Sequence, residues 1–249
     1  RVRSGAMTVG VVGYTNAGKS SLVHHLSGKT VLVEDQLFST LETTVGRMEK
    51  SPRILLADTI GFIDNIPNAT LAAFKATIAE AIDADLTLIL VDTSDPLDEV
   101  RRKLETTRRE VLERQEHEPE ALEEGRPPQV VLTKIDATTA EQQQAASDLV
   151  VSHGFPTPVA VSSMTGEGVD ELQRFIREQL FGAPVQVHVH PPSAASPDAT
   201  ERIVSSVYDQ GMVEVDERSE QGSAVLKVWI TAACQAQLQS RWGARIDIK

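Results

Sequence analysis

The nine residues 13–21 (GYTNAGKSS) have the types and spacing of a phosphate-binding loop, G-x-x-x-x-G-K-[ST]. A loop of this kind, between a strand and a helix, directs several backbone N–H groups toward one point, where they can meet the charge of a triphosphate. Lys19 would reach the terminal phosphates, and the hydroxyl of Ser20 would bind Mg²⁺. Because the pattern also occurs by chance, the rest of the chain must decide whether a nucleotide binds here.

A second sequence with suitable chemistry, Asp58-Thr59-Ile60-Gly61, directly follows the apolar run 53–57. An aspartate at a strand end can hold Mg²⁺, directly or through water, and the N–H of Gly61 could meet a γ-phosphate. The alternative is a plain turn, because aspartate and glycine both favour turns. The next residue is Phe62, where many nucleotide hydrolases have a glutamine that orients the attacking water. A phenyl ring cannot do this, so we expect slow intrinsic hydrolysis and a catalytic group from elsewhere, with Phe62 packing as core.

Two more sequences at strand ends indicate a guanine base. Thr133-Lys134-Ile135-Asp136 resembles the guanine-reading sequence Asn-Lys-x-Asp. The carboxylate of Asp136 could accept from the ring N–H and the exocyclic amine of guanine, a donor pair that adenine lacks, and the stem of Lys134 would lie over the base plane. Thr133 lacks the amide of the usual asparagine, which leaves the bracing of the phosphate loop open. Ser162-Ser163-Met164 resembles Ser-Ala-Lys, whose backbone N–H meets the guanine O6.

Four such sequences in this order predict a GTP site, with ATP specificity as a minor alternative. The residues of these motifs that we expect to bind nucleotide are Gly13, Tyr14, Thr15, Asn16, Ala17, Gly18, Lys19, Ser20, Ser21, Asp58, Thr59, Ile60, Gly61, Thr133, Lys134, Ile135, Asp136, Ser162, Ser163 and Met164.

Apolar, β-prone runs alternate with helical stretches over residues 8–182. Near-continuous apolar strands indicate a mainly parallel sheet buried on both faces, so we predict a doubly wound α/β fold with ligands at the carboxyl ends of the strands. The expected strands are 8–12, 53–57, 86–91, 129–132 and 158–161, and the expected helices are 20–27, 69–83, 96–114, 139–152 and 167–180.

The pattern changes after Leu180, and residues 183–249 predict a separate small α+β domain. We expect residues 1–7 to be a tail or linker. His188 and His190 lie on one side of a predicted strand, a spacing that could suit a metal, but no third ligand is evident and we expect them to face solvent. The elements expected here are a strand at 185–190, a helix at 198–210, strands at 212–217 and 224–231, and a short final helix.

The composition, with 41% hydrophobic and 24% charged residues among 249, is typical of an ordinary globular chain. The formal net charge of −12 argues against a wide basic surface for free DNA or other nucleic acid, so any such contact must be local. No apolar run approaches the roughly 20 residues of a membrane helix, and we expect no membrane association. The one cysteine, Cys234, excludes an intramolecular disulfide and fits a reducing cytoplasm. We expect a monomer.

The motifs together resemble those of the HflX family, a relative of the Obg proteins. The resemblance is strong over 8–182 and weaker over 199–242, and it implies a Ras-like GTPase domain followed by the family's small C-terminal domain. It also implies that GTP and GDP bind with Mg²⁺, and that the large ribosomal subunit is a partner that stimulates hydrolysis. The family's usual N-terminal domain and helical linker do not precede this sequence, so we expect a truncated member. Besides the phosphate loop, the resemblance rests on residues 38–42, 58–63, 66–67, 73–74, 84–85 and 91–96, with Thr77 and Glu80.

The resemblance implies a first switch formed by Phe38, Ser39, Thr40, Leu41 and Glu42, with Thr40 as a second hydroxyl ligand of Mg²⁺ beside Ser20 and Asp58. This chain departs from the family's usual Pro-Thr-Thr-Arg after that segment, so Thr43 or Thr44 could be the ligand instead.

Asn16, Lys19 and Gly61 are the expected catalytic residues. Asn16 resembles an asparagine that helps bind K⁺ in related GTPases, and such an ion would neutralise charge between the β- and γ-phosphates. The alternative is that Asn16 only braces the loop. For the whole chain, the alternatives to a ribosome-stimulated GTPase are a nucleotide-regulated binding module that hardly hydrolyses and a ribosome-independent GTPase.

Overall fold

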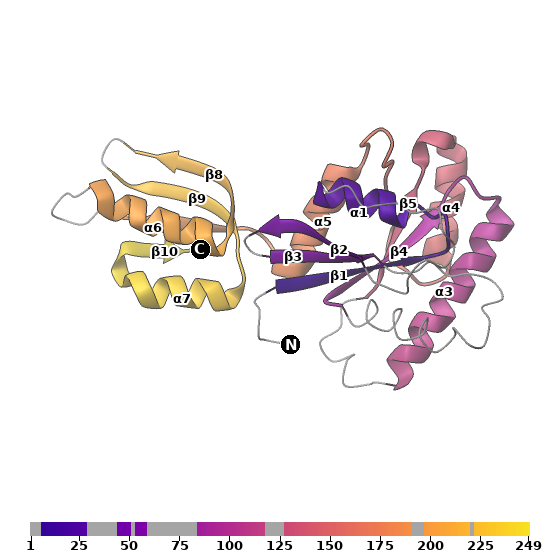
Figure 1. Ribbon diagram of the computed structural model, residues 1–249, viewed down its shortest axis with the longest axis horizontal. Coiled ribbons are helices and arrows are strands. Elements are labelled where there is room, and N and C mark those ends of the chain that lie inside the picture. The colour runs from indigo at the N-terminus through magenta and orange to yellow at the C-terminus, as the bar shows by residue number, and fades with distance from the viewer. Residues whose placement is uncertain are drawn as a thin grey trace. The chain divides into compact units, whose positions relative to one another are not determined.

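The computed structural model describes residues 6–28, 44–50, 53–58, 84–117, 127–190, 197–219 and 222–249. The chain divides into two compact units (Figure 1). The first is formed by residues 7–48 and 55–176, and the second by residues 1–6, 49–54 and 177–249. We expected the two domains to meet between residues 182 and 183. The C-terminal segment of the second unit begins at residue 177, a few residues earlier, and the assignment of domains stays a prediction.

A six-stranded sheet with the order β2-β3-β1-β4-β5-β6 lies mainly in the first unit. Neighbouring strands from β1 to β6 along this order run parallel. Strands β2 and β3 are neighbours separated by only residues 51–52, and so short a connection permits only an antiparallel pair. The strands are β1 (Ala6–Gly13), β2 (Thr44–Lys50), β3 (Arg53–Asp58), β4 (Leu86–Asp92), β5 (Gln129–Thr133) and β6 (Val159–Ala160).

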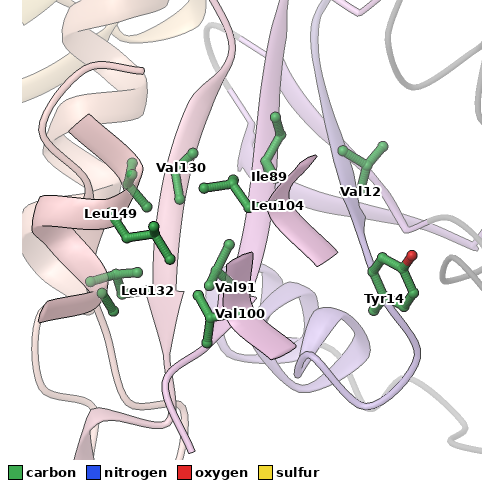
Figure 2. Packing of buried hydrophobic residues seen from close by; sticks show 11 residues of the cluster. Val12, Tyr14, Ile89, Val91, Val100, Leu104, Val130, Leu132 and Leu149 are labelled. Atoms are coloured by element: carbon green, nitrogen blue, oxygen red, sulfur yellow. The ribbon is translucent and has the colours of Figure 1, made fainter. Parts of the chain in front are cut away.

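Helices cover both faces of this sheet. On one face, side chains of β1, β4 and β5 form a buried cluster with Val100 and Leu104 of α3 and Leu149 of α4 (Figure 2). Every residue of β4 and β5 is buried, which confirms the interior parallel strands expected from their apolar sequences. The helices are α1 (Lys19–Ser27), α3 (Leu97–His117), α4 (Ala140–Ser152) and α5 (Val169–Phe181).

All five strands predicted for this region are present, and so are four of its five predicted helices; the fifth, 69–83, lies outside the described residues. The sequence did not indicate β2. Its residues, TVGRMEK, are largely polar, and β2 lies at the edge of the sheet, where a strand needs no continuous apolar run.

The second unit contains a four-stranded antiparallel sheet with the order β10-β7-β9-β8. Its apolar side packs on α6 and α7 through residues such as Val187, Leu226, Ile203 and Leu238. The predicted order of elements is confirmed, but a strand follows the final helix. The elements are β7 (Val185–Val189), α6 (Pro197–Gln210), β8 (Met212–Arg218), β9 (Ala224–Trp229), α7 (Ala232–Trp242) and β10 (Ile246–Ile248).

The structure describes both histidines singled out in this unit, and also Cys234. His190 pairs with Asp247 at 2.9 Å, and within the described ranges no three histidine, cysteine or acidic residues come close enough to hold a metal ion. Cys234 is free and half-buried. None of the helices in the described part of the chain has the length and apolar character that crossing a membrane requires.

Candidate nucleotide site

The phosphate loop connects β1 to α1 and depends on two glycines. Gly13 has a φ of 153°, and a Cβ there would lie 2.8 Å from the carbonyl oxygen of Leu90, so a larger residue would collide with β4. Gly18 is the N-cap of α1 in the left-handed conformation, and no side chain caps the helix. The first N–H groups of α1 are therefore left for a ligand, as an anion site requires. Asn16 is also left-handed, with a φ of 66°, and is exposed.

Lys19 follows Gly18 as the first residue of α1 and is almost fully buried. Its ammonium donates to the carbonyl oxygens of Tyr14 at 2.8 Å and Gly13 at 3.2 Å. Burial lowers the pKa of Lys19 to about 8, although the negative charge of Asp58 opposes this shift. A bound phosphate would add negative charge here and favour the protonated form.

Asp58 ends β3 beside the loop and is also buried. Burial raises its pKa, while a hydrogen bond from Ser20 and the charge of Lys19 act in the opposite direction. Its Oδ1 atom is buried and has no hydrogen-bond partner within the described residues. A carboxylate oxygen left without a partner, next to a serine hydroxyl, matches the all-oxygen ligands that Mg²⁺ prefers. The residues present therefore fit the metal predicted from the sequence.

Thr133, at the end of β5, braces the phosphate loop despite the missing amide. Its hydroxyl lies 2.9 Å from the carbonyl oxygen of Ala17 and 3.2 Å from that of Val91. The carbonyl of Thr133 in turn accepts from the N–H and the hydroxyl of Thr93, at 3.1 and 2.8 Å. A threonine hydroxyl therefore reaches the loop from the position where the usual motif has an asparagine.

A hydrogen bond between Asp136 and Ser162 joins the two motifs that we expect to read the base. The hydroxyl of Ser162 donates to Oδ1 of Asp136 at 2.5 Å and accepts from the N–H groups of Met164 and Thr165. The Asp136 carboxylate is thereby held by a fully buried serine. Met164 is 86% exposed, so its side chain takes no part in this arrangement.

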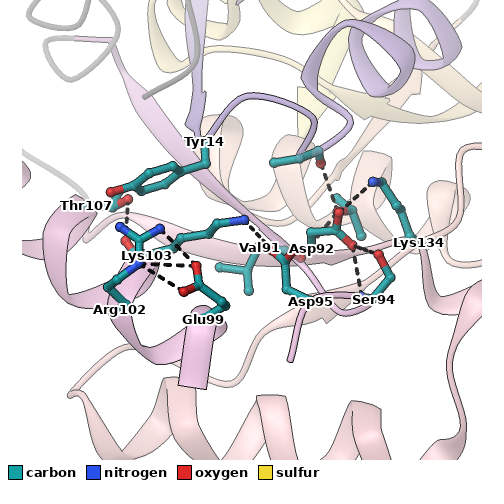
Figure 3. A network of polar contacts seen from close by, with 12 residues as sticks. Tyr14, Val91, Asp92, Ser94, Asp95, Glu99, Arg102, Lys103, Thr107 and Lys134 are labelled. Carbon is teal, nitrogen blue, oxygen red and sulfur yellow. Dashed lines mark hydrogen bonds and ion pairs between the residues drawn. The ribbon is translucent and has the colours of Figure 1, made fainter. Parts of the chain in front are cut away.

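Lys134 makes a contact that the sequence motif did not indicate. Its ammonium lies 2.5 Å from Oδ2 of Asp92, the last residue of β4 (Figure 3). In the sequence, the one signal for this ion pair was an aspartate at the carboxyl end of a predicted central strand. The other candidate residues fall outside the described part of the chain: Phe38, Ser39, Thr40, Leu41, Glu42, Thr43, Thr59, Ile60, Gly61 and Phe62. Thr44 is the first residue of β2.

Two family models match most of this chain. Residues 8–134 match the family described as 50S ribosome-binding GTPase, and residues 150–248 match the HflX C-terminal domain. Curated GTPase HflX proteins of Gluconacetobacter diazotrophicus and Akkermansia muciniphila are 36% and 35% identical to the chain and match 98% and 96% of it. The chain spans only 50% and 52% of their lengths.

A solved structure is similar in fold. The crystal structure of a GTP-binding protein from the archaeon Sulfolobus solfataricus, in complex with GDP, has a TM-score of 0.51 at 24% identity. The match covers 70% of this chain and 52% of that one. Two family matches that together take in both sheets, with relatives similar along nearly the whole sequence, show that this chain belongs to the HflX family.

Proposed function

We propose that this chain binds GTP and GDP with Mg²⁺, hydrolyses GTP, and changes conformation with the nucleotide while it engages the large ribosomal subunit. The observation that carries the proposal is the hydrogen bond between Thr133 and Ala17, because it joins a guanine motif to a phosphate loop in one site. Binding of GDP by a solved structure of similar fold, and the family's description as ribosome-binding, support the same assignment.

The roles of the residues follow from their chemistry. Lys19 and the N–H groups at the start of α1 would bind the phosphates, and Asp136 would accept the two donors of guanine. Ser20 and Asp58 would hold Mg²⁺, which neutralises phosphate charge when bound. Thr40 and Gly61 remain the proposed partners of the metal and the γ-phosphate.

Binding of the base can be tested with Asp136→Asn. The wild-type chain should bind GDP and not ADP, and the variant should lose GDP affinity because an amide cannot accept from both guanine donors. The Ser162 bond can be kept, since an amide oxygen also accepts. The variant should gain affinity for xanthosine diphosphate, whose ring N–H and carbonyl match an amide. Undiminished GDP binding by the variant would show that the guanine assignment is wrong.

Hydrolysis is proposed to be slow without the ribosome, because Phe62 stands where a water-orienting glutamine is usual. Single-turnover release of phosphate, with and without large ribosomal subunits, measures this directly. Stimulation supports the proposal, whereas no release in either case favours the nucleotide-regulated binding module. Co-sedimentation with ribosomal subunits, in the presence of a GTP analogue and of GDP, tests the third alternative. A ribosome-independent GTPase would not sediment with the subunits in either state.

Potassium is the proposed second cofactor, with Asn16 as one of its ligands. Asn16 is exposed at the loop, so its side chain can face a ligand. Turnover measured in K⁺ and in Na⁺ at equal ionic strength, for wild type and Asn16→Ala, tests the idea. Equal rates in both salts would leave Asn16 with only a bracing role.

The chain spans about half of its curated relatives, so these measurements should be repeated with a full-length relative. We further propose a cytoplasmic monomer, consistent with a ribosomal partner. Its expected parts are a tail (1–7), a GTPase domain (8–182) and a small C-terminal domain (183–249).

A further inference from the structure

We propose that Asp92 is a positioning residue for the guanine base, acting through Lys134. The proposal rests on the proposed guanine-nucleotide site and adds to it a residue from a strand that carries none of the four motifs. Asp92 would hold the lysine ammonium so that the alkyl stem forms one wall of the base site before any nucleotide arrives.

Both oxygens of the Asp92 carboxylate have defined partners (Figure 3). Oδ1 accepts from the N–H and the hydroxyl of Ser94, at 2.9 and 2.6 Å. Oδ2 lies 2.5 Å from the ammonium of Lys134. One oxygen therefore fixes the orientation of the carboxylate and the other receives the lysine, which is a more rigid arrangement than an ion pair between two free side chains.

The burial of the Asp92–Lys134 ion pair also favours a substantial electrostatic interaction between the two side chains. The Asp92 side chain is 9% exposed and that of Lys134 is 39% exposed. Burial alone would raise the pKa of Asp92, but the hydrogen bonds from Lys134 and Ser94 hold it below its usual value. Asp92 is therefore charged at neutral pH, and its partner is only partly screened by water.

The backbone around Lys134 is already held on both sides. Thr93 donates twice to the carbonyl of Thr133, and the amide of Gln143 on α4 donates to the carbonyl of Ile135 at 2.9 Å. Lys134 itself has a left-handed φ of 59°, unusual for a residue other than glycine. What the backbone does not control is the long side chain, whose free rotation costs entropy whenever a ligand immobilises it.

An ammonium held by Asp92 removes that entropic cost before binding. A lysine stem stretched from the end of β5 toward the end of β4 presents methylene groups to a flat base and keeps the charge on a fixed partner. Because this contact is made at the base and not at the phosphates, it should affect GDP and GTP equally.

The test compares affinities for fluorescent GDP and a non-hydrolysable GTP analogue. We expect Asp92→Asn, which keeps the size and can keep a bond from Ser94, to weaken both nucleotides by roughly tenfold, the scale of a charged hydrogen bond. The ratio of GTP to GDP affinity should not change. Asp95→Asn is the matched control, since Asp95 forms an ion pair with Lys103 at 2.6 Å that does not include the guanine motif. Its affinities should equal those of wild type.

A double-mutant cycle separates positioning from general stability. Lys134→Met should weaken binding to a similar extent, and Asp92→Asn added to it should have no further effect. A general loss of stability would instead lower affinity in both backgrounds. Additive losses, or wild-type affinity in a folded Asp92→Asn variant, would overturn the proposal.

If Asp92→Asn does not fold, Ser94→Ala replaces it in the same cycle, because it loosens the carboxylate without changing the charge. A smaller fall in affinity that vanishes in the Lys134→Met background supports the proposal, and no fall overturns it. Failure of the wild-type chain to bind GDP would instead overturn the proposed function itself, and this inference with it.

Discussion

The hydroxyl of Thr133 donates a hydrogen bond to the carbonyl oxygen of Ala17 across 2.9 Å, between two residues 116 positions apart in the chain. Thr133 is 2% exposed and Ala17 3% exposed, so water cannot replace this bond. The end of β5 and the phosphate loop are thereby linked directly. A substitution at the end of β5 should therefore alter nucleotide binding by the loop.

Removal of that hydroxyl should weaken nucleotide binding. Thr133→Val keeps the shape of the side chain but leaves the carbonyl of Ala17 without this donor, at a cost of about 1–3 kcal/mol. We expect a lower melting temperature and a GDP affinity reduced by about tenfold or more, measured by titration calorimetry. Thr133→Asn is the control, because its amide can donate again and should restore part of the affinity. Wild-type affinity in Thr133→Val would show that the bond does not support the loop.

The low pKa of Lys19 predicts how nucleotide affinity depends on pH. Without nucleotide the pKa is about 8, and phosphate binding favours the charged form. Affinity should therefore be nearly constant below pH 7 and fall as pH rises through 8, by roughly tenfold between pH 7 and pH 9. Lys19→Ala should bind weakly at every pH, with a much flatter curve. A flat wild-type curve in this range would contradict the assignment of Lys19 to the phosphates.

Asp58 should control the metal dependence. Its buried Oδ1 lacks a hydrogen-bond partner among the described residues, which fits a ligand of Mg²⁺. We expect Asp58→Asn to lower the apparent Mg²⁺ affinity of the GTP complex by about 10-fold or more, measured by magnesium titration after chelation. Asp85→Asn is the comparison, because Asp85 precedes β4, near the amino end of that strand, and accepts hydrogen bonds from Thr8. Equal magnesium curves for both variants would exclude Asp58 as a ligand.

The same variant should be more stable than wild type when no nucleotide is present. The folded-state pKa of Asp58 is raised, chiefly by burial, so the native protein binds its proton more tightly than the unfolded chain does. The stability contributed by this group is thus present at low pH and is lost as pH rises through its pKa. Asp58→Asn should raise the melting temperature at pH 7 by a few degrees, and the gain should shrink in acid. A lower melting temperature at pH 7 would contradict the desolvation cost.

Gly168 should tolerate no side chain, because it closes the loop that carries Ser162. Its φ is 73°, and a Cβ would lie 2.0 Å from the carbonyl oxygen of Ala160. Gly154 has a similar φ of 84° but nothing within 4 Å, so Gly154→Ala should cost only the backbone strain, about 1–2 kcal/mol. Gly168→Ala should cost several times more in thermal unfolding experiments. Similar melting temperatures for the two variants would show that the loop before α5 can move aside.

The motifs and most elements could be predicted from the sequence because each depends on neighbours in the chain. The loop at residues 13–21 requires a strand before it and a helix after it, and has glycines at two of its positive-φ positions, 13 and 18. The buried strands β4 and β5 need continuous apolar residues. β2 and β10 escaped prediction for the opposite reason: their existence depends on a partner strand more than on their own residues.

Residue types and their spacing already specify which groups could bind a guanine nucleotide, since that chemistry depends on them. Which of these groups touch depends on the fold. The pairing of Thr133 with Ala17, the pairing of Lys134 with Asp92, and the unpartnered oxygen of Asp58 all follow from the strand order β3-β1-β4-β5. That order brings the carboxyl ends of strands that are distant in the chain to one edge of the sheet, and local sequence does not specify it.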